Sequence, residues 1–192
     1  MGGIEISAAQ PTSIFGNAVS NNPIDDPGPV TLRVKFWSSQ PGTIAGIRFY
    51  RAAANSQGYV AKLYTASGTL LGSTTIARES GPLPGWQEAD FASPIPISAN
   101  TTYVAAYYCS VGQGAWDAFG LTNGVTNGPL TSPASGAVGG NGVYDYGNVF
   151  PSSSFAGQQL LRRRGVRACG GGTLPDPHLK STHSQRLEEE PN

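Results

Sequence analysis

The side chains in this sequence that could carry acid–base chemistry are carboxylates without a histidine partner. Both histidines, His178 and His183, lie near the C-terminal end, and residues 1–157 contain none. The usual Ser-His and Cys-His nucleophile arrangements, and the commonest zinc ligand, are therefore absent from that part of the sequence. A pair of carboxylates could still cleave a glycosidic bond, but no spacing among the acids singles out two of them. The acids between residues 12 and 157 are Asp25, Asp26, Glu79, Glu88, Asp90, Asp117 and Asp145. We expect no enzyme and no catalytic residue, and a glycoside-acting enzyme remains the weaker alternative.

Two adjacent acids, Asp25 and Asp26, could offer oxygen ligands to calcium from the loop before the first clear strand. The prolines at positions 23, 27 and 29 favour a turn or a solvated loop instead. No EF-hand or nonapeptide calcium pattern occurs in the sequence. We therefore expect no cofactor, and calcium at these two residues is the only metal that we consider.

Aromatic residues beside acids and amides form a second kind of candidate site, because such mixtures bind sugars. The ring covers the apolar face of a pyranose, and the acid and amide take hydrogen bonds from its hydroxyl groups. The segment 141–147 contains Asn141, Tyr144, Asp145 and Tyr146, and the pair Trp116 and Asp117 precedes it. Aromatics in glycine-rich loops also fold back as plugs over one end of a sandwich, and for the two tyrosines we favour that role. The role of Trp116 remains open between ligand binding and packing.

Hydrophobic alternation predicts the strands that must position these residues. Apolar and polar residues alternate at period two in several short segments that turn signals separate. The expected strands are 30–37, 44–50, 59–64, 69–76, 86–91 and 103–109, and the third and fourth form a hairpin around Ser67 and Gly68. Trp37 and Trp86 are predicted to point outward, where they could bind a ligand or cover apolar surface. Residues 112–155 read as long loops that carry aromatics. With no helical period, the sequence predicts an all-β antiparallel sandwich or jelly roll.

The composition of the sequence restricts which partners and which cellular location we expect. Charged residues make up 12% of the chain and balance to zero, which argues against nucleic acid as a partner. No apolar run is long enough to span a membrane. Residues 1–6 lack the basic and apolar regions of a signal peptide. Cys109 ends an apolar strand and is expected to be a buried, inert thiol, and a structural disulfide to Cys169 is not expected.

The composition changes after residue 157, which sets the domain boundaries. Every aromatic lies at or before Phe155, whereas half of the basic residues and both histidines lie after Gly157. We predict an N-terminal extension over residues 1–11, a sandwich module over 12–157 and a disordered tail over 158–192.

Seven segments of the sequence, taken in order, carry a family resemblance. They are Ser13–Gly16, Val30–Phe36, Gly46–Tyr50, Gly85–Gln87, Ala99–Ala105, Asn127–Leu130 and Gly139–Gly147. Together they resemble DUF4082, a bacterial domain of unknown function. The resemblance implies a β-sandwich of a secreted or cell-surface protein, beside immunoglobulin-like repeats or carbohydrate-active parts. It implies no mechanism, because the activity of the family is not established.

The end of the chain departs from that family, whose members close on a strand of the type Ser-Asn-Tyr-x-Val-Asp-Val-x-Phe. This sequence has Gln158 to Val166 in its place. Codons for that run, read one nucleotide later, can spell Ser-Asn-Tyr-Cys-Val-Asp-Val-Ala-Phe. We hypothesise that the tail is out of frame, and codons that cannot give this second reading would refute the hypothesis.

These observations predict a non-catalytic accessory module of an extracellular or cell-surface bacterial protein. Its expected partner is a glycan or a surface, or neighbouring domains of a larger chain. The alternative is a structural spacer or adhesion domain with no small ligand, in which the aromatics only pack.

Overall fold

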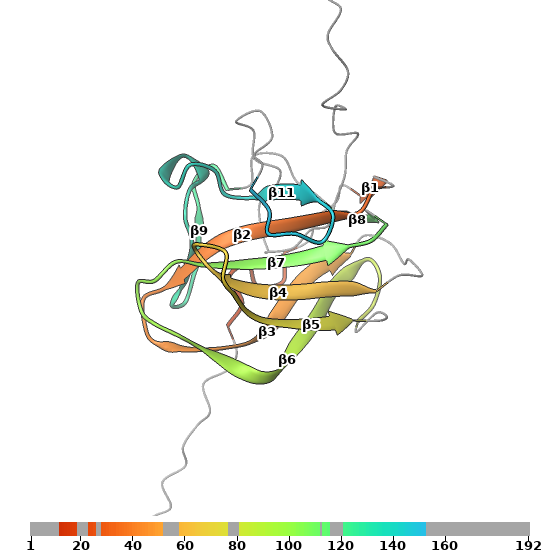
Figure 1. Ribbon diagram of the computed structural model, residues 1–192. Helices are drawn as coiled ribbons and strands as arrows, with labels where there is room; N and C mark the ends of the chain where they lie inside the picture. The colour runs from red at the N-terminus through yellow and green to blue at the C-terminus, as the bar shows by residue number, and fades with distance from the viewer. Residues whose placement is uncertain are drawn as a thin grey trace, which may run out of the picture.

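The protein is an antiparallel β-sandwich in the computed structural model, which describes residues 12–18, 23–25, 28–51, 58–76, 81–111, 113–115 and 121–152 (Figure 1). Every strand pairing among these residues is antiparallel. The predicted extension over 1–11 and the predicted tail over 158–192 lie outside the described residues. The all-β sandwich expected from the sequence is confirmed.

The larger layer is a seven-stranded sheet with the order β5-β4-β7-β2-β10-β9, and β11 pairs with β2 beside β10. Its strands are β2 (Val30–Ser38), β4 (Tyr59–Thr65), β5 (Leu70–Ile76), β7 (Tyr103–Cys109), β9 (Val125–Asn127), β10 (Leu130–Ser132) and β11 (Val143–Tyr146). The strand β7 lies between β4 and β2, and its nearly continuous apolar sequence suits this central place. The hairpin of β4 and β5 forms as predicted.

The smaller layer pairs β3 (Gly42–Arg51) with β6 (Gly85–Ile97) and lies behind the large sheet in the view of Figure 1. A separate short pair joins β1 (Pro23–Asp25) to β8 (Gln113–Ala115). The 3-10 helix η1 (Ser135–Ala137) follows β10. The register between β3 and β6 shifts between Ile44 and Gly46, which takes up the unequal lengths of the two strands.

The core lies between the two sheets and follows the predicted alternation. On β2, the side chains of Val30, Leu32, Val34 and Phe36 are buried in the core cluster. The alternate residues of β2, which include Arg33 and Lys35, lie on the opposite face of the sheet. At the centre, the fully buried ring of Phe49 stacks on Tyr107, with the ring centroids 4.8 Å apart, and lies 5.0 Å from Tyr59. These aromatic contacts join β3 to β7 and β4 and thus hold the two layers together.

Two parts of the strand prediction were wrong. The strand β6 continues through Ile97, because its C-terminal part pairs with the first residues of β3. The region 112–155 was predicted as loops, but it contains β8, β9, β10 and β11. Three of these strands have only three residues, so their periodicity is too short to be recognised in a sequence.

Cys109 is buried as predicted, with 1% of its surface exposed, but it is disulfide-bonded rather than a free thiol. The only other cysteine, Cys169, lies outside the described residues.

The described residues form no helix of the length and apolarity that crossing a membrane requires.

Candidate functional site

The segment 141–147 places an acid next to aromatic residues in the sequence, but in the structure the acid and the aromatics lie on opposite faces of the sheet. Tyr144 pairs with Leu32 and Asp145 pairs with Thr31, so these two neighbours on β11 point to opposite faces of the sheet. Tyr144 packs against the core, which is the plug role that we favoured for it. Its pKa is raised by burial and by the negative charge of Asp145. Tyr146 meets the ring of Tyr144 edge to face, with centroids 5.9 Å apart, and is 43% exposed.

Asp145 holds the loop that follows β11. Its Oδ2 accepts hydrogen bonds of 3.2 Å from both the backbone N–H and the hydroxyl of Ser152. In addition, the Thr31 hydroxyl donates to the carbonyl of Gly147 at 2.6 Å. The acid therefore fixes the path of residues 147–152 across the outer face of the large sheet.

Asn141, the amide in the predicted sugar site, is 1% exposed and bonded within the protein. Its Oδ1 accepts from the backbone N–H of Lys35 at 2.7 Å. Its Nδ2 lies within hydrogen-bond distance of the carbonyls of Lys35 and Pro133 and of the Ser132 hydroxyl. These bonds tie the glycine-rich loop to the edge of β2, and they leave the amide no exposed surface with which to meet a sugar.

The outer face of the small sheet gathers a tryptophan, an arginine and two acids. In the β3–β6 pairing, Tyr50 lies opposite Trp86, Arg48 opposite Glu88, and Gly46 opposite Asp90. Directly paired residues share a face, so all of these side chains project away from the core. We call this surface the Trp86 face, and it consists of Arg48, Tyr50, Trp86, Glu88 and Asp90. The outward direction predicted for Trp86 is confirmed, since it shares this outer face with the two acids.

Contacts from two sides fix the indole of Trp86. The guanidinium carbon of Arg48 lies 5.1 Å from the ring centroid, within the range of a cation–π contact. The ring of Tyr50 meets the indole edge to face at 5.3 Å. Tyr50 is 4% exposed, and burial raises the pKa of its hydroxyl. Trp86 itself is half-buried, so part of the indole still faces solvent.

Arg48 connects the Trp86 face to the N-terminal segment. Its Nη1 donates to the Ser13 hydroxyl at 3.0 Å and to the carbonyl of Gly16 at 3.1 Å. Its Nε lies 2.6 Å from Oε1 of Glu88, although the N–H does not point along this contact, so the two form an ion pair without an aligned hydrogen bond. With this many partners, the guanidinium is held in one position beside the indole.

Asp90 lies on the same face against a glycine. A Cβ added to Gly46 would come within 2.6 Å of Oδ1 of Asp90 and 2.5 Å of the carbonyl oxygen of Ala89. Only glycine therefore fits opposite this acid. Both Asp90 and Glu88 are exposed, the latter with 57% of its side chain. The face thus offers a positioned indole edged by one cation and two carboxylates, which are the group types that bind sugar rings and their hydroxyls.

The other predicted site residues do not join this face. Trp37 is half-buried on β2, in the large sheet, and lies opposite Thr131 of β10. Trp116, Asp117 and Asp26 lie outside the described residues. For Asp25 the structure describes the backbone alone, which pairs with Gln113 in the β1–β8 ladder. Among residues with described positions, no group of three or more His, Cys, Asp or Glu side chains is arranged to hold a metal ion.

Sequence reasoning missed Arg48 as a member of the site. The alternation of β6 placed Trp86, Glu88 and Asp90 together, but no local pattern indicates which strand lies beside β6. The pairing of β3 with β6 supplies Arg48, and this register becomes visible only in the fold.

The fold and its surfaces define an all-β sandwich domain with an aromatic and charged outer face. The chain belongs to the DUF4082 family, a domain of unknown function, whose model matches residues 17–160. No curated protein and no solved structure matches the chain.

Proposed function

We propose that this domain is a non-catalytic accessory module that binds carbohydrate on the Trp86 face, in an extracellular or cell-surface bacterial protein. The observation that carries the proposal is the half-buried indole of Trp86, positioned by Arg48 and Tyr50 beside two exposed carboxylates. An indole that is already held in place loses little conformational entropy when a sugar stacks on it. Glu88 and Asp90 can accept hydrogen bonds from the hydroxyl groups at the ring edge.

The positions of Glu88 and Asp90 argue against glycosidase activity. Glycosidases place one carboxylate on each side of the scissile bond and shield the reaction from water. Here Glu88 and Asp90 project side by side from one strand of an exposed face. Binding without catalysis is therefore the function that this arrangement supports best.

A glycan array tests the proposal, with the wild-type domain and Trp86→Ala compared at equal concentration. Trp37→Ala is the matched control, because it removes the same side chain from the outer face of the other sheet. We expect a set of glycans that the wild type and Trp37→Ala bind and that Trp86→Ala does not. A circular-dichroism melt of each variant shows that the domain is still folded. The proposal is wrong if the wild type binds no glycan, or if the folded Trp86→Ala binds the same set.

A structural spacer is the second candidate function, and one observation favours it. Arg48 covers the Trp86 ring and also bonds to Ser13 and Gly16, so this cluster has a packing role of its own. In a pure spacer, Trp86→Ala would lower the melting temperature, and no glycan would raise the melting temperature of the wild type. Ligand-dependent stabilisation of the wild type therefore separates the two functions.

A further inference from the structure

The outer face of the large sheet, opposite to the Trp86 face, gathers three basic side chains. Lys62 on β4 and Arg33 on β2 both lie opposite Ala106 of the strand between them. Lys35, two residues along β2 from Arg33, lies opposite Val104 of the same central strand. All three side chains therefore project from the same face over small or medium apolar residues. We call Arg33, Lys35 and Lys62 the basic cluster.

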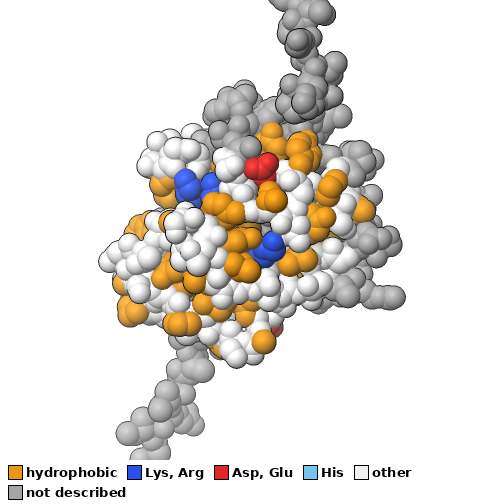
Figure 2. All heavy atoms as spheres, viewed as in Figure 1, with side chains coloured by type: hydrophobic (Ala, Val, Ile, Leu, Met, Phe, Trp, Pro, Cys, Tyr) orange, Lys and Arg blue, Asp and Glu red, His pale blue; other side chains and the backbone are white. Residues whose placement is uncertain are grey.

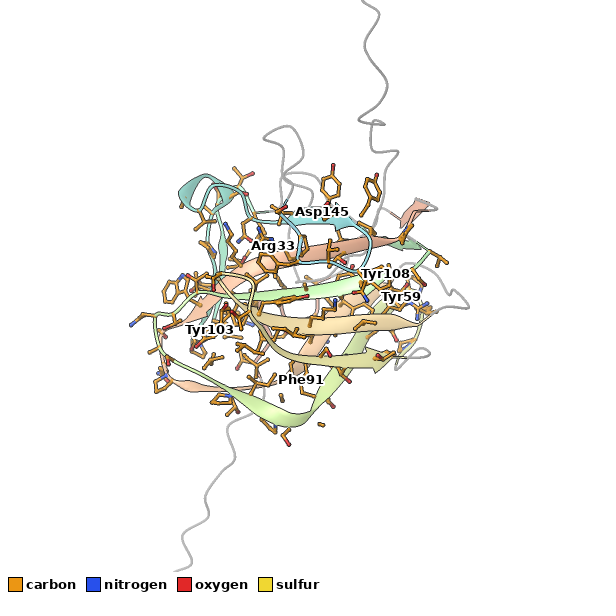
Figure 3. All side chains as sticks on the ribbon, viewed as in Figure 1. Arg33, Tyr59, Phe91, Tyr103, Tyr108 and Asp145 are labelled. Atoms are coloured by element: carbon orange, nitrogen blue, oxygen red, sulfur yellow. The ribbon has the colours of Figure 1, made fainter. Side chains whose placement is uncertain are left out.

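Figure 2 views the molecule onto this face and shows basic side chains at two places on it, among apolar side chains. A single acid accompanies them among the described residues of this face, namely Asp145, which pairs with Thr31 one row further along. Figure 3 shows Arg33 and Asp145 on neighbouring strands of this face. Although the whole chain has a formal net charge of zero, this face carries three cations against one carboxylate.

The two lysines of the cluster are hydrogen-bonded to neutral oxygens, and only Arg33 is near a carboxylate, that of Asp145. Lys35 donates from Nζ to the carbonyl of Val138 at 2.6 Å, and Lys62 donates from Nζ to Oδ1 of Asn148. Each ammonium group has three N–H donors, so two remain on the half-buried Lys35, whereas Lys62 is only 9% exposed. Nε of Arg33 is buried and has no hydrogen-bond partner. The cluster therefore has accessible unused donors on Lys35, and it carries excess positive charge.

The surroundings of the cluster disfavour the charged forms. Burial lowers the pKa of Arg33 and of Lys62, and Asp145 offsets part of the effect on Arg33. Burial also lowers the pKa of Lys35, and the neighbouring positive charge of Arg33 lowers it further. A bound anion would relieve both the desolvation and the repulsion between like charges.

Two aromatic rings lie on the same face. Phe150 packs over Val104 and Ala106, and the guanidinium carbon of Arg33 lies 4.6 Å from its ring centroid. Tyr108 lies opposite Thr31 and is half-buried. Rings next to cations suit a polymer of sugar rings that carry negative charge, because the rings stack and the charges pair.

We propose that the basic cluster binds a polysaccharide that carries carboxylate groups, on the face opposite to the Trp86 face. The planar guanidinium of Arg33 can pair with a carboxylate in two-point contact, and the lysines bind as point charges. A nucleic acid is the less suitable polyanion, because three cations on two strands do not form a track that follows a phosphate backbone.

The probe for this proposal is polygalacturonic acid, and its methyl-esterified form is the matched neutral polymer. Isothermal titration calorimetry on the full chain should give binding to the acid form and at least about tenfold weaker binding to the ester, since the ester removes the charge-assisted hydrogen bonds. The affinity for the acid form should fall as the salt concentration rises. Equal affinity for both polymers, or an affinity that salt does not change, would overturn the proposal.

Variants locate the binding on the chain. The change Arg33→Gln with Lys62→Met should weaken binding to the acid polymer at least about tenfold, since it removes two charged donors. A triple change to Gln at Arg162, Arg163 and Arg164 is the control, because these residues form a separate basic run in the sequence. Binding that survives the first change and disappears with the triple change would assign the polyanion to the C-terminal run and would refute the proposal. A circular-dichroism melt confirms that each variant is folded. If Arg33→Gln with Lys62→Met does not fold, Lys35→Gln replaces it and must also weaken binding.

Discussion

The guanidinium of Arg48 lies over the indole of Trp86, with 5.1 Å between the guanidinium carbon and the ring centroid. These two residues come from different strands and are 38 positions apart in the sequence. The contact joins the proposed sugar-binding ring to the N-terminal segment, because the same guanidinium donates to the Ser13 hydroxyl and to the carbonyl of Gly16. Stability and the proposed binding function therefore share one side chain.

The first prediction concerns Arg48 itself. Arg48→Met should lower the free energy of unfolding by about 1–2 kcal/mol, since it removes hydrogen bonds from a charged donor to Ser13 and Gly16. Glu88→Gln neutralises the exposed carboxylate of the ion pair and should cost less than about 1 kcal/mol. Urea unfolding followed by circular dichroism measures both. Equal losses for the two variants would show that the N-terminal contacts contribute nothing.

The second prediction uses two glycines of the same strand. Gly46→Ala would bring a methyl group within 2.5 Å of the Ala89 carbonyl oxygen, so it should cost about 1–3 kcal/mol in unfolding free energy as β3 and β6 move apart. Gly42→Ala is the matched control, because an added Cβ there meets no atom within 4 Å. We expect that change to stay within about 0.5 kcal/mol of the wild type. A Gly46→Ala domain as stable as Gly42→Ala would contradict the close packing of β6 against this position.

The third prediction concerns the buried amide of Asn141. Asn141→Ala should lower the free energy of unfolding by about 2–4 kcal/mol, because it removes the acceptor of the Lys35 backbone N–H and the hydrogen bond that the Ser132 hydroxyl accepts. Asn141→Ala should nevertheless keep any glycan binding of the folded domain, since the amide is 1% exposed. If folded Asn141→Ala no longer binds glycan, Asn141 belongs to the binding site and the prediction is wrong.

The fourth prediction is a pH dependence at Lys62. Burial lowers the folded-state pKa of this lysine below its ordinary value of 10.5, so the charged form is less favourable in the folded protein than in the unfolded one. At neutral pH both states are charged and the folded state bears the full cost. As the pH rises through the lowered pKa towards 10.5, the folded state loses its proton first and the cost disappears.

The measurement compares the wild type with Lys62→Met from pH 7 to pH 10.5 by urea unfolding. The groups that lie near Lys62 on this face are Asn148, Arg33, Tyr64 and Tyr108. They are present in both proteins, so the difference between the two reports mainly on Lys62. The stability of the wild type relative to Lys62→Met should rise with pH. A difference that stays constant over this range would show that burial imposes no cost on the charged lysine.

Local sequence patterns predicted most of the fold because alternation is a local property. The strand 30–37 was recognised from side chains that alternate between the core and the outer face, and the hairpin of β4 and β5 from a serine and a glycine between two such runs. The short strands β9 and β10 were missed, because three residues hold no recognisable period. They form because β10 pairs with the end of β2, a partner more than 90 residues away.

The candidate site was harder to predict for the same reason. Tyr144, Asp145 and Tyr146 were candidates for one sugar site because they are adjacent, although we favoured a plug for the tyrosines. In the structure, adjacent residues of this strand point to opposite faces. In contrast, Trp86 and Arg48 meet through the register of two strands, which no local pattern contains. The basic cluster could not be predicted from the net charge of zero, because the net charge of a chain does not show which face carries the basic and which the acidic side chains.

The measurement that tests the central claim most directly is a binding titration of the wild-type domain and of Trp86→Ala with the strongest glycan from the array. Isothermal titration calorimetry should give saturable binding to the wild type and at least about tenfold weaker binding to the folded Trp86→Ala, since the indole supplies the surface on which the sugar ring stacks. Trp37→Ala should bind as the wild type does. Equal affinity of the wild type and Trp86→Ala, or no glycan bound by the wild type at all, would contradict carbohydrate binding on the Trp86 face.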